Sequence, residues 1–315
     1  MGASTVAAQP RQTQDPSVAP PDATAKSKQK AKAALPGEPA APNPVEKKRD
    51  YSQEGFVVEQ LGVHYRFESD GTGRKEIIAR IHVQSEAGVQ QWGQLQFGYN
   101  SANEKLEIPY VRVLKKDGSV VKAGDDAVQD LSAPIERDAP VYTDYRQKHV
   151  TVPGLRPGEV LEYDLVTVIH TPLAAGQFWA DYDFDKNNIV LDEELSVDVP
   201  ASRPLKLKNK SGLDPKISEE NGRRIYRWTS SHLVREDDDK NKPNADKKKK
   251  KKADDDRPDV QLTTFTSWEE IGRWYAALEK DRRVPSPEVR AKAEELTKGF
   301  ATDLDKTEAL YDFVA

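Results

Sequence analysis

The chain has 315 residues, of which 36% are hydrophobic and 32% charged, and its formal net charge is −5. This slightly acidic balance gives no reason to expect nucleic acid as a partner, and no apolar run approaches the roughly 18 residues that a membrane-spanning helix needs. The absence of cysteine excludes disulfides, thiolate metal sites and a cysteine nucleophile from these residues.

The first 50 residues form a Pro- and Ala-rich leader without a single aromatic residue. Such a segment has too little apolar surface to offset the entropy of ordering, so we predict that residues 1–50 are disordered. Small residues at Val6-Ala7-Ala8-Gln9 match a signal-peptidase site, although no apolar stretch precedes them. They indicate either the remainder of an export signal or an ordinary Ala-rich leader. On the first interpretation we expect a periplasmic or otherwise exported protein, whereas the second leaves a cytoplasmic protein open.

Residues 51–232 show the alternation of apolar and polar residues that is typical of half-buried strands. The turns Ser69-Asp-Gly-Thr-Gly73 and Lys116-Asp-Gly-Ser119 each join two such strands into a hairpin. About nine short strands favour an antiparallel β-sandwich-like domain over a parallel sheet, with residues 124–147 as a long surface loop. The predicted strands are 63–67, 77–83, 106–113, 120–122, 150–152, 159–169, 177–184, 189–199 and 224–229.

Residues 233–257 are rich in lysine and aspartate. Six consecutive lysines, Lys247 to Lys252, could bind phosphates or an anionic membrane. Acidic triplets on both sides screen the positive charge at short range, so we predict a solvated linker.

Residues 258–315 carry the signals of three helices. Ser267-Trp-Glu-Glu270 forms a capping box in which the serine hydroxyl and the glutamate carboxylate each bind a free backbone N–H, and Trp268 and Trp274 lie on the apolar stripe that follows. We expect both tryptophans to pack in the core between the helices and whatever follows. The second helix begins at Ser286-Pro287 and ends at Gly299.

The third helix begins near Thr302 or Asp305 and presents Leu310, Phe313 and Val314 to one side. No capping residue follows it, which predicts a helix that is interrupted in a truncated chain. The alternative is an ordinary C-terminal helix that frays.

Several of these segments resemble a known family. Tyr142-Thr-Asp-Tyr-Arg146, the stretch from His149 to Tyr163 and Lys116-Asp-Gly-Ser119 resemble the bacterial domain of unknown function DUF3857. Phe265 to Tyr275 and Lys306 to Val314 are similar to the segment that joins this domain to a transglutaminase-like core.

The resemblance implies a mainly β chain: an antiparallel β-sandwich-like domain at 51–232, then a short helical segment at 258–315 that begins an α+β transglutaminase-like core. It implies that the catalytic Cys, His and Asp lie beyond residue 315, so no catalytic or cofactor-binding residue is assigned here. We therefore expect a non-catalytic module that supports or orients the missing C-terminal domain or binds a protein or glycan partner. The alternative is the N-terminal fragment of a cysteine acyl-transfer enzyme or peptidase.

Three groups of polar residues remain as candidate sites. The first, between Asp181 and Asp192, resembles a calcium loop in which Lys186 stands where glycine is expected. It fits an amphipathic strand equally well. The second, from Tyr142 to Arg146, is either a recognition surface or a loop that is fixed onto the sandwich by hydrogen bonds. His64 and His82 form the third and could meet across a hairpin, but too few ligands accompany them for a zinc site, so solvent-facing histidines are expected. The calcium candidates are Asp181, Asp183, Asp185, Asn187 and Asp192, and the recognition candidates are Tyr142, Asp144, Tyr145 and Arg146.

Overall fold

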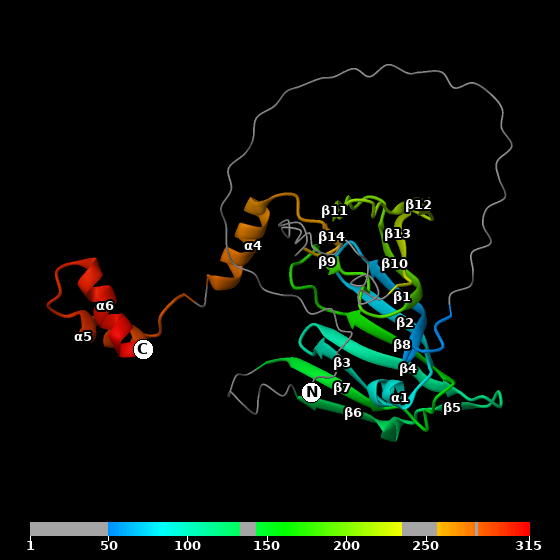
Figure 1. Ribbon diagram of the computed structural model, residues 1–315. Coiled ribbons are helices and arrows are strands. Elements are labelled where there is room, and N and C mark those ends of the chain that lie inside the picture. The colour runs from blue at the N-terminus through cyan, green and yellow to red at the C-terminus, as the bar shows by residue number, and fades with distance from the viewer. Residues whose placement is uncertain (1–49, 133–142, 235–256, 281–282) are drawn as a thin grey trace, which may run out of the picture.

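The computed structural model describes residues 50–132, 143–234, 257–280 and 283–315 (Figure 1). Residues 1–49 of the predicted leader, most of the charged linker and residue Tyr142 lie outside these ranges. Within them the protein is mainly β, with three longer helices in the last fifth of the chain. No helix among the described residues is long and apolar enough to cross a membrane.

One large sheet organises the molecule. Its eight strands are antiparallel throughout except where β1 and β10 run parallel. In spatial order they are β12 (Lys216–Glu220), β13 (Arg223–His232), β10 (Val190–Pro200), β1 (Phe56–Phe67), β2 (Gly73–Val83), β8 (Glu159–Ile169), β4 (Glu104–Leu114) and β5 (Val120–Lys122).

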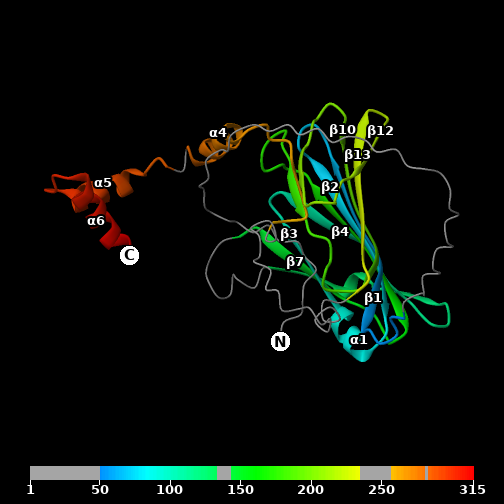
Figure 2. The ribbon, with the colours of Figure 1, turned by 45° about the horizontal axis from the view of Figure 1, so that its top comes forward.

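Two three-stranded sheets form a second layer over one face of the large sheet (Figures 1 and 2). The first comprises β3 (Gln94–Asn100), β7 (Tyr145–Thr151) and β6 (Val128–Ser132), in that order. The second comprises β11 (Lys206–Asn209), β14 (Val260–Thr263) and β9 (Trp179–Tyr182). The short helices α1 (Glu86–Trp92) and η1 (Asp125–Ala127) connect strands.

The period of two along each strand explains why both small sheets lie on the same face. In β2, Ala79, Ile81 and Val83 point inward and join the core beneath β3 and β7. In β10, Leu195 and Val197 point to the same side and join a second core beneath β9 and β14. The opposite face is polar and carries ion pairs such as Arg112 Nε to Glu162 at 2.7 Å. The expected mainly β, antiparallel-rich sandwich is therefore confirmed.

One expectation about the β region is wrong. Residues 124–147 are not one long loop, because η1, β6 and the start of β7 lie within the described part of this stretch. The sandwich also contains a parallel pair, β1 with β10, which links strands more than 120 residues apart. Hydrophobic periodicity cannot predict such a pairing, since it identifies strands without their partners. It also missed α1, β3, β11, β12 and β14.

The three predicted helices are confirmed as α4 (Trp268–Glu279), α5 (Pro287–Thr297) and α6 (Asp303–Val314). The hydroxyls of Ser267, Ser286 and Thr302 each accept a hydrogen bond from the backbone N–H three residues on. The capping box at α4 is only half formed, because the carboxylate of Glu270 accepts from Thr266 N, at 2.8 Å, rather than from Ser267 N.

Candidate functional site

Strand β14 ties the segment after the charged linker to the β region. It is the central strand of its sheet and pairs with both β9 and β11. Val260 and Leu262 are buried in the second core against β10 and β13. Residues 258–315, predicted as the helical start of a transglutaminase-like domain, therefore begin with a strand that pairs with the β region, and the domain assignment itself stays a prediction. The four residues of β14, Val-Gln-Leu-Thr, are too short for their periodicity to be recognised. We call the three sheets, β14 included, the β unit.

A buried carboxylate anchors the start of β14. Asp259 is 1% exposed and accepts hydrogen bonds from Lys186 Nζ, at 2.6 and 2.7 Å, and from Phe184 N at 3.1 Å. Lys210 Nζ lies 3.0 Å from Asp259 Oδ1. Burial alone would raise the pKa of Asp259, but the hydrogen bonds from the two lysines outweigh it and lower the pKa below its usual value. Asp259 N in turn donates to Asp183 Oδ1 at 3.0 Å.

A second buried acid, Glu193 of β10, lies in the same polar network. It is 1% exposed and accepts from Tyr182 Oη at 2.7 Å and from Asp185 N at 3.1 Å. Among the residues that the structure describes, no lysine, arginine or histidine forms an ion pair with Glu193. Its pKa is raised, first by burial and further by the charges of Asp185 and Asp259, against the opposing hydrogen bonds. Burial and the neighbouring Glu193 raise the pKa of Tyr182 as well, so this phenol stays protonated.

A buried threonine anchors the other end of β14. Thr264 Oγ1 accepts from Phe178 N at 3.0 Å and donates to Gln177 Oε1 at 2.5 Å. The amide of the same Gln177 donates to Glu270 Oε1, in the first turn of α4, at 2.7 Å. One glutamine therefore links the end of the strand to the start of the helix.

An aromatic cluster fixes the face of α4. The rings of Trp179, Phe265 and Trp274 lie with centroids 5.6 to 5.9 Å apart in all three pairs. Trp274 Nε1 also donates to Leu173 O at 3.2 Å. Aromatic pairs of this kind contribute about 0.5–1.5 kcal/mol each beyond the area that they bury. We call this assembly, from Asp259 through β14 and Thr264 to Trp274, the junction.

The two tryptophans of α4 thus have different environments. Trp274 packs on β9 of the β unit, whereas Trp268 is 82% exposed. Trp274 therefore packs on the β unit rather than between the helices, and the predicted contact of Trp268 with whatever follows stays a prediction.

The predicted calcium loop lies beside the junction. Asp183 accepts from Asp259 N, while Asp185 Oδ1 accepts from Asn187 N and Asn188 N and closes a tight turn. Asp181 and Asp192 are exposed on strands. Among the described residues no three His, Asp or Glu side chains converge as metal ligands would. Lys186 supplies an ammonium to the neighbouring carboxylate, so calcium binding stays a prediction for which this geometry offers no support.

The predicted recognition cluster is partly described. Arg146 Nε donates to Asp130 Oδ1 at 2.9 Å, and Tyr99 Oη donates to the other oxygen at 2.8 Å. Asp144 contributes its backbone carbonyl, which accepts from Ser101 N at 2.8 Å, and the ring of Tyr145 lies directly over Gly98. These contacts join β3, β6 and β7 and favour the interpretation as a pinned loop, while a ligand contact stays a prediction.

The two strand histidines do not meet. In the β1–β2 register His64 lies opposite Glu76 and His82 opposite Val57, at different ends of the hairpin. His64 Nδ1 is 2.7 Å from Ser196 Oγ of β10. Both are half-buried on the polar face.

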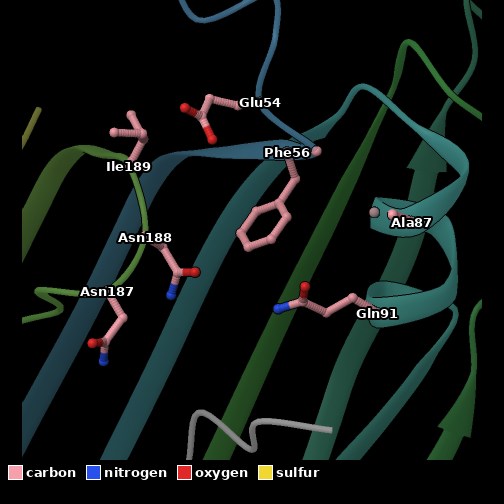
Figure 3. A pocket seen from close by; sticks show the side chains of 9 residues that line it. Glu54, Phe56, Ala87, Gln91, Asn187, Asn188 and Ile189 are labelled. Carbon is pink, nitrogen blue, oxygen red and sulfur yellow. The ribbon is translucent and has the colours of Figure 1, made fainter. Parts of the chain in front are cut away.

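A small pocket adjoins the junction at the turn 185–188. Its volume is about 160 Å³, and Asn188 and Gln91 point from opposite sides toward the Phe56 ring (Figure 3). Phe56 is held by Trp92 in an edge-to-face contact at 5.3 Å. This pocket could not be predicted from sequence patterns, since its residues come from three separate segments.

The family described as "Domain of Unknown Function with solved-structure structure (DUF3857)" matches residues 69–236, slightly more than half of the chain. No curated protein matches the chain.

Among solved structures, a candidate protease from Parabacteroides distasonis is similar with 17% identity and a TM-score of 0.65, over 82% of this chain and 50% of that one. The chain thus spans half the length of that protein, and the likeness shows the fold alone. An M1 zinc metallopeptidase from Deinococcus radiodurans matches 56% of this chain and 39% of that one (15% identity, TM-score 0.32). A candidate nutrient-binding protein from Legionella pneumophila matches 80% and 82% (13% identity, TM-score 0.33). Both TM-scores are too low to carry a conclusion.

Proposed function

The chain belongs to the DUF3857 family, and from this premise we propose that its β unit is a non-catalytic module that holds the first helix of a following transglutaminase-like domain in a fixed orientation. The observation that carries the proposal is the junction. Buried polar groups at both ends of β14 and the aromatic cluster around Trp274 attach α4 to the β unit.

The arrangement suits an orienting role because strand and helix are held through different kinds of contact. Asp259 and Thr264 fix the strand with directional hydrogen bonds, which tolerate little displacement. Trp274 adds a large rigid ring and one further hydrogen bond to Leu173 O. Only two residues, Thr266 and Ser267, separate Phe265 of the aromatic cluster from the first residue of α4. A rigid connection of this length transmits the position of the β unit to the helix.

The free faces of the helices support a following domain. Tyr275 and Leu278 of α4 and Phe313 of α6 are each at least half exposed. Exposed apolar patches commonly mark an interaction surface. We infer that the transglutaminase-like domain implied by the sequence covers them.

We also propose that the whole protein is exported, a location that cell fractionation with a periplasmic marker can test.

A second candidate function belongs to the whole protein. It is a cysteine acyl-transfer enzyme or peptidase whose nucleophile lies outside these residues, a candidate favoured by the shared fold with the longer Parabacteroides distasonis candidate protease. Assaying the longest gene product for peptide hydrolysis and amine transfer distinguishes the two. Activity that requires a cysteine supports the second candidate for the whole protein, and activity in residues 1–315 alone would overturn the non-catalytic role.

The orienting role is tested with two tryptophans of one helix. We expect Trp274→Ala to raise the rate of amide hydrogen exchange throughout α4 and at Thr264, because the contact with β9 is lost. Trp268→Ala is the matched control and should leave these rates unchanged, since its ring is exposed. Equal rates in both variants would contradict the proposal.

A further inference from the structure

Two turns that lie about 40 residues apart in the sequence form one cleft. The turn of the β4–β5 hairpin contributes Lys116 and Asp117, and the turn between β7 and β8 contributes Arg156 and Pro157. The cleft has a volume of about 580 Å³, which lies within the usual range of about 300–1,000 Å³ for small-molecule sites. The hairpin β4–β5 lies at the end of the β unit that is away from β14 and α4 (Figure 1).

A buried carboxylate organises the floor of the cleft. Glu159 is 6% exposed and accepts from Arg156 N at 2.8 Å and from Lys115 Nζ at 3.0 Å. Lys115 also donates to Gly154 O. The charge of Lys115 is therefore matched by Glu159, and the backbone of Arg156 is held in place.

Lys116 lines the cleft beside a glycine of the second turn. Gly158 has φ +82°, and a Cβ there would come within 2.3 Å of Lys116 Cε and 2.7 Å of its Nζ. The left-handed backbone requires glycine at this position, and the end of the Lys116 side chain lies close beside it. The ammonium group of Lys116 consequently lies over the second turn, on the same cleft as Arg156.

Two cations of the cleft, Lys116 and Arg156, have no ion-pair partner among the residues that the structure describes. Lys115, Lys116 and Arg156 supply three positive charges, and Asp117 and Glu159 supply two negative charges, so the lining carries a net charge of +1. Lys115 is matched by Glu159. Asp117 is turned back onto its own turn, where Oδ1 accepts from Ser119 N at 2.9 Å and Oγ at 2.6 Å. These hydrogen bonds from Ser119 lower the pKa of the Asp117 carboxyl, so Asp117 remains an anion beside the cleft.

We propose that this cleft binds an oxyanion, a phosphate or carboxylate group, between the guanidinium of Arg156 and the ammonium of Lys116. A guanidinium binds two oxygens of such a group through its planar fork, and an ammonium adds a point charge. The group belongs to a small anionic metabolite or to the headgroup of an anionic lipid. Asp117 limits the affinity through repulsion of the bound anion.

The test titrates the whole chain with pyrophosphate, with citrate and with phosphatidylglycerol vesicles, and measures binding by calorimetry. The double variant Lys116→Gln/Arg156→Gln should weaken binding of the preferred probe by about tenfold or more, since both charge-assisted contacts are lost. The matched control is Lys208→Gln/Lys216→Gln, which removes two exposed charges from β11 and β12 and should leave the affinity unchanged. Asp117→Asn keeps the turn but removes the like charge, and should raise the affinity a few fold.

The probes identify the source of the anion. Binding of pyrophosphate or citrate in solution supports a metabolite, and binding of vesicles alone supports a lipid headgroup. Absence of binding to all three probes would overturn the proposal, as would equal weakening by both double variants. A weaker complex with Asp117→Asn would also contradict it, because the sign of the effect follows from the charge.

Discussion

At the scale of single residues, the two buried carboxylates beside β14 have pKa shifts of opposite sign. Asp259 and Glu193 are equally buried, but two lysines bind Asp259, whereas Glu193 accepts only from neutral donors. Ion pairing therefore lowers one pKa and burial raises the other.

Glu193 makes stability depend on pH. Its pKa is raised in the folded chain above the ordinary value of 4.5, so its contribution to stability is full below that value and is lost as the pH rises through the folded pKa. Glu193→Gln keeps an oxygen for Tyr182 and Asp185 but carries no charge. We expect the melting temperature of this variant, relative to the unaltered chain, to rise between pH 4.5 and pH 8. The control is Asp192→Asn, a change at the exposed neighbouring residue, which should show no such trend. If the melting temperatures of Glu193→Gln and of the unaltered chain changed in parallel with pH, the raised pKa of Glu193 would be contradicted.

Asp259 shows the reverse dependence. Its pKa is lowered below 3.8, so its stabilising contribution is present above that value and is lost as the pH falls through the folded pKa. Asp259→Asn removes the negative charge that pairs with Lys186 and Lys210 and leaves them one acceptor oxygen instead of two, and should lower the free energy of unfolding at pH 7 by about 2–3 kcal/mol. Urea denaturation measures this change. Asp181→Asn, on the exposed side of β9, is the control and should stay within about 0.5 kcal/mol.

At the scale of elements, the helices could be predicted and several strands could not. Ser267, Ser286 and Thr302 cap their helices through contacts within four residues, so the sequence contains the whole signal. Strand β14 depends on β9 and β11, which come about 80 and 50 residues earlier. Its short segment carries no pattern of its own, and only tertiary contact selects it.

The same reason explains what was missed at the junction. The apolar stripe of the helix indicates Trp274, but its partner Trp179 lies 95 residues away and no local pattern connects them. The alternating acids of 181–185 resembled a metal loop because Asp183 and Asp185 do accept hydrogen bonds at regular spacing. Their donors are backbone N–H groups, including that of Asp259, and the side-chain amide of Asn188.

The turn 185–188 gives a prediction about metal. Because Asp185 already accepts from Asn187 N and Asn188 N, we expect neither added calcium nor a chelator to change the melting temperature. Differential scanning calorimetry with and without chelator measures this. A melting temperature that falls on chelation would revive the calcium hypothesis for Asp181 to Asp192.

At the scale of the whole molecule, the stability should be unequal along the chain. Helices α5 and α6 pack on each other and contain no buried residue, whereas both cores of the β unit contain fully buried side chains. We expect residues 287–314 to exchange their amide hydrogens before any strand of the large sheet. Mass-spectrometric hydrogen exchange shows this directly, and protection in α6 equal to that in β10 would contradict it.

The central claim is that the β unit fixes the orientation of α4. The natural lack of cysteine allows two spin labels to be placed cleanly, at Thr229→Cys on β13 and Arg273→Cys on α4, both exposed positions. Pulsed electron spin resonance then measures the distribution of distances between the labels. We predict one narrow distribution that Trp268→Ala preserves and Trp274→Ala broadens. A broad distribution in the chain without either tryptophan substitution would contradict the claim.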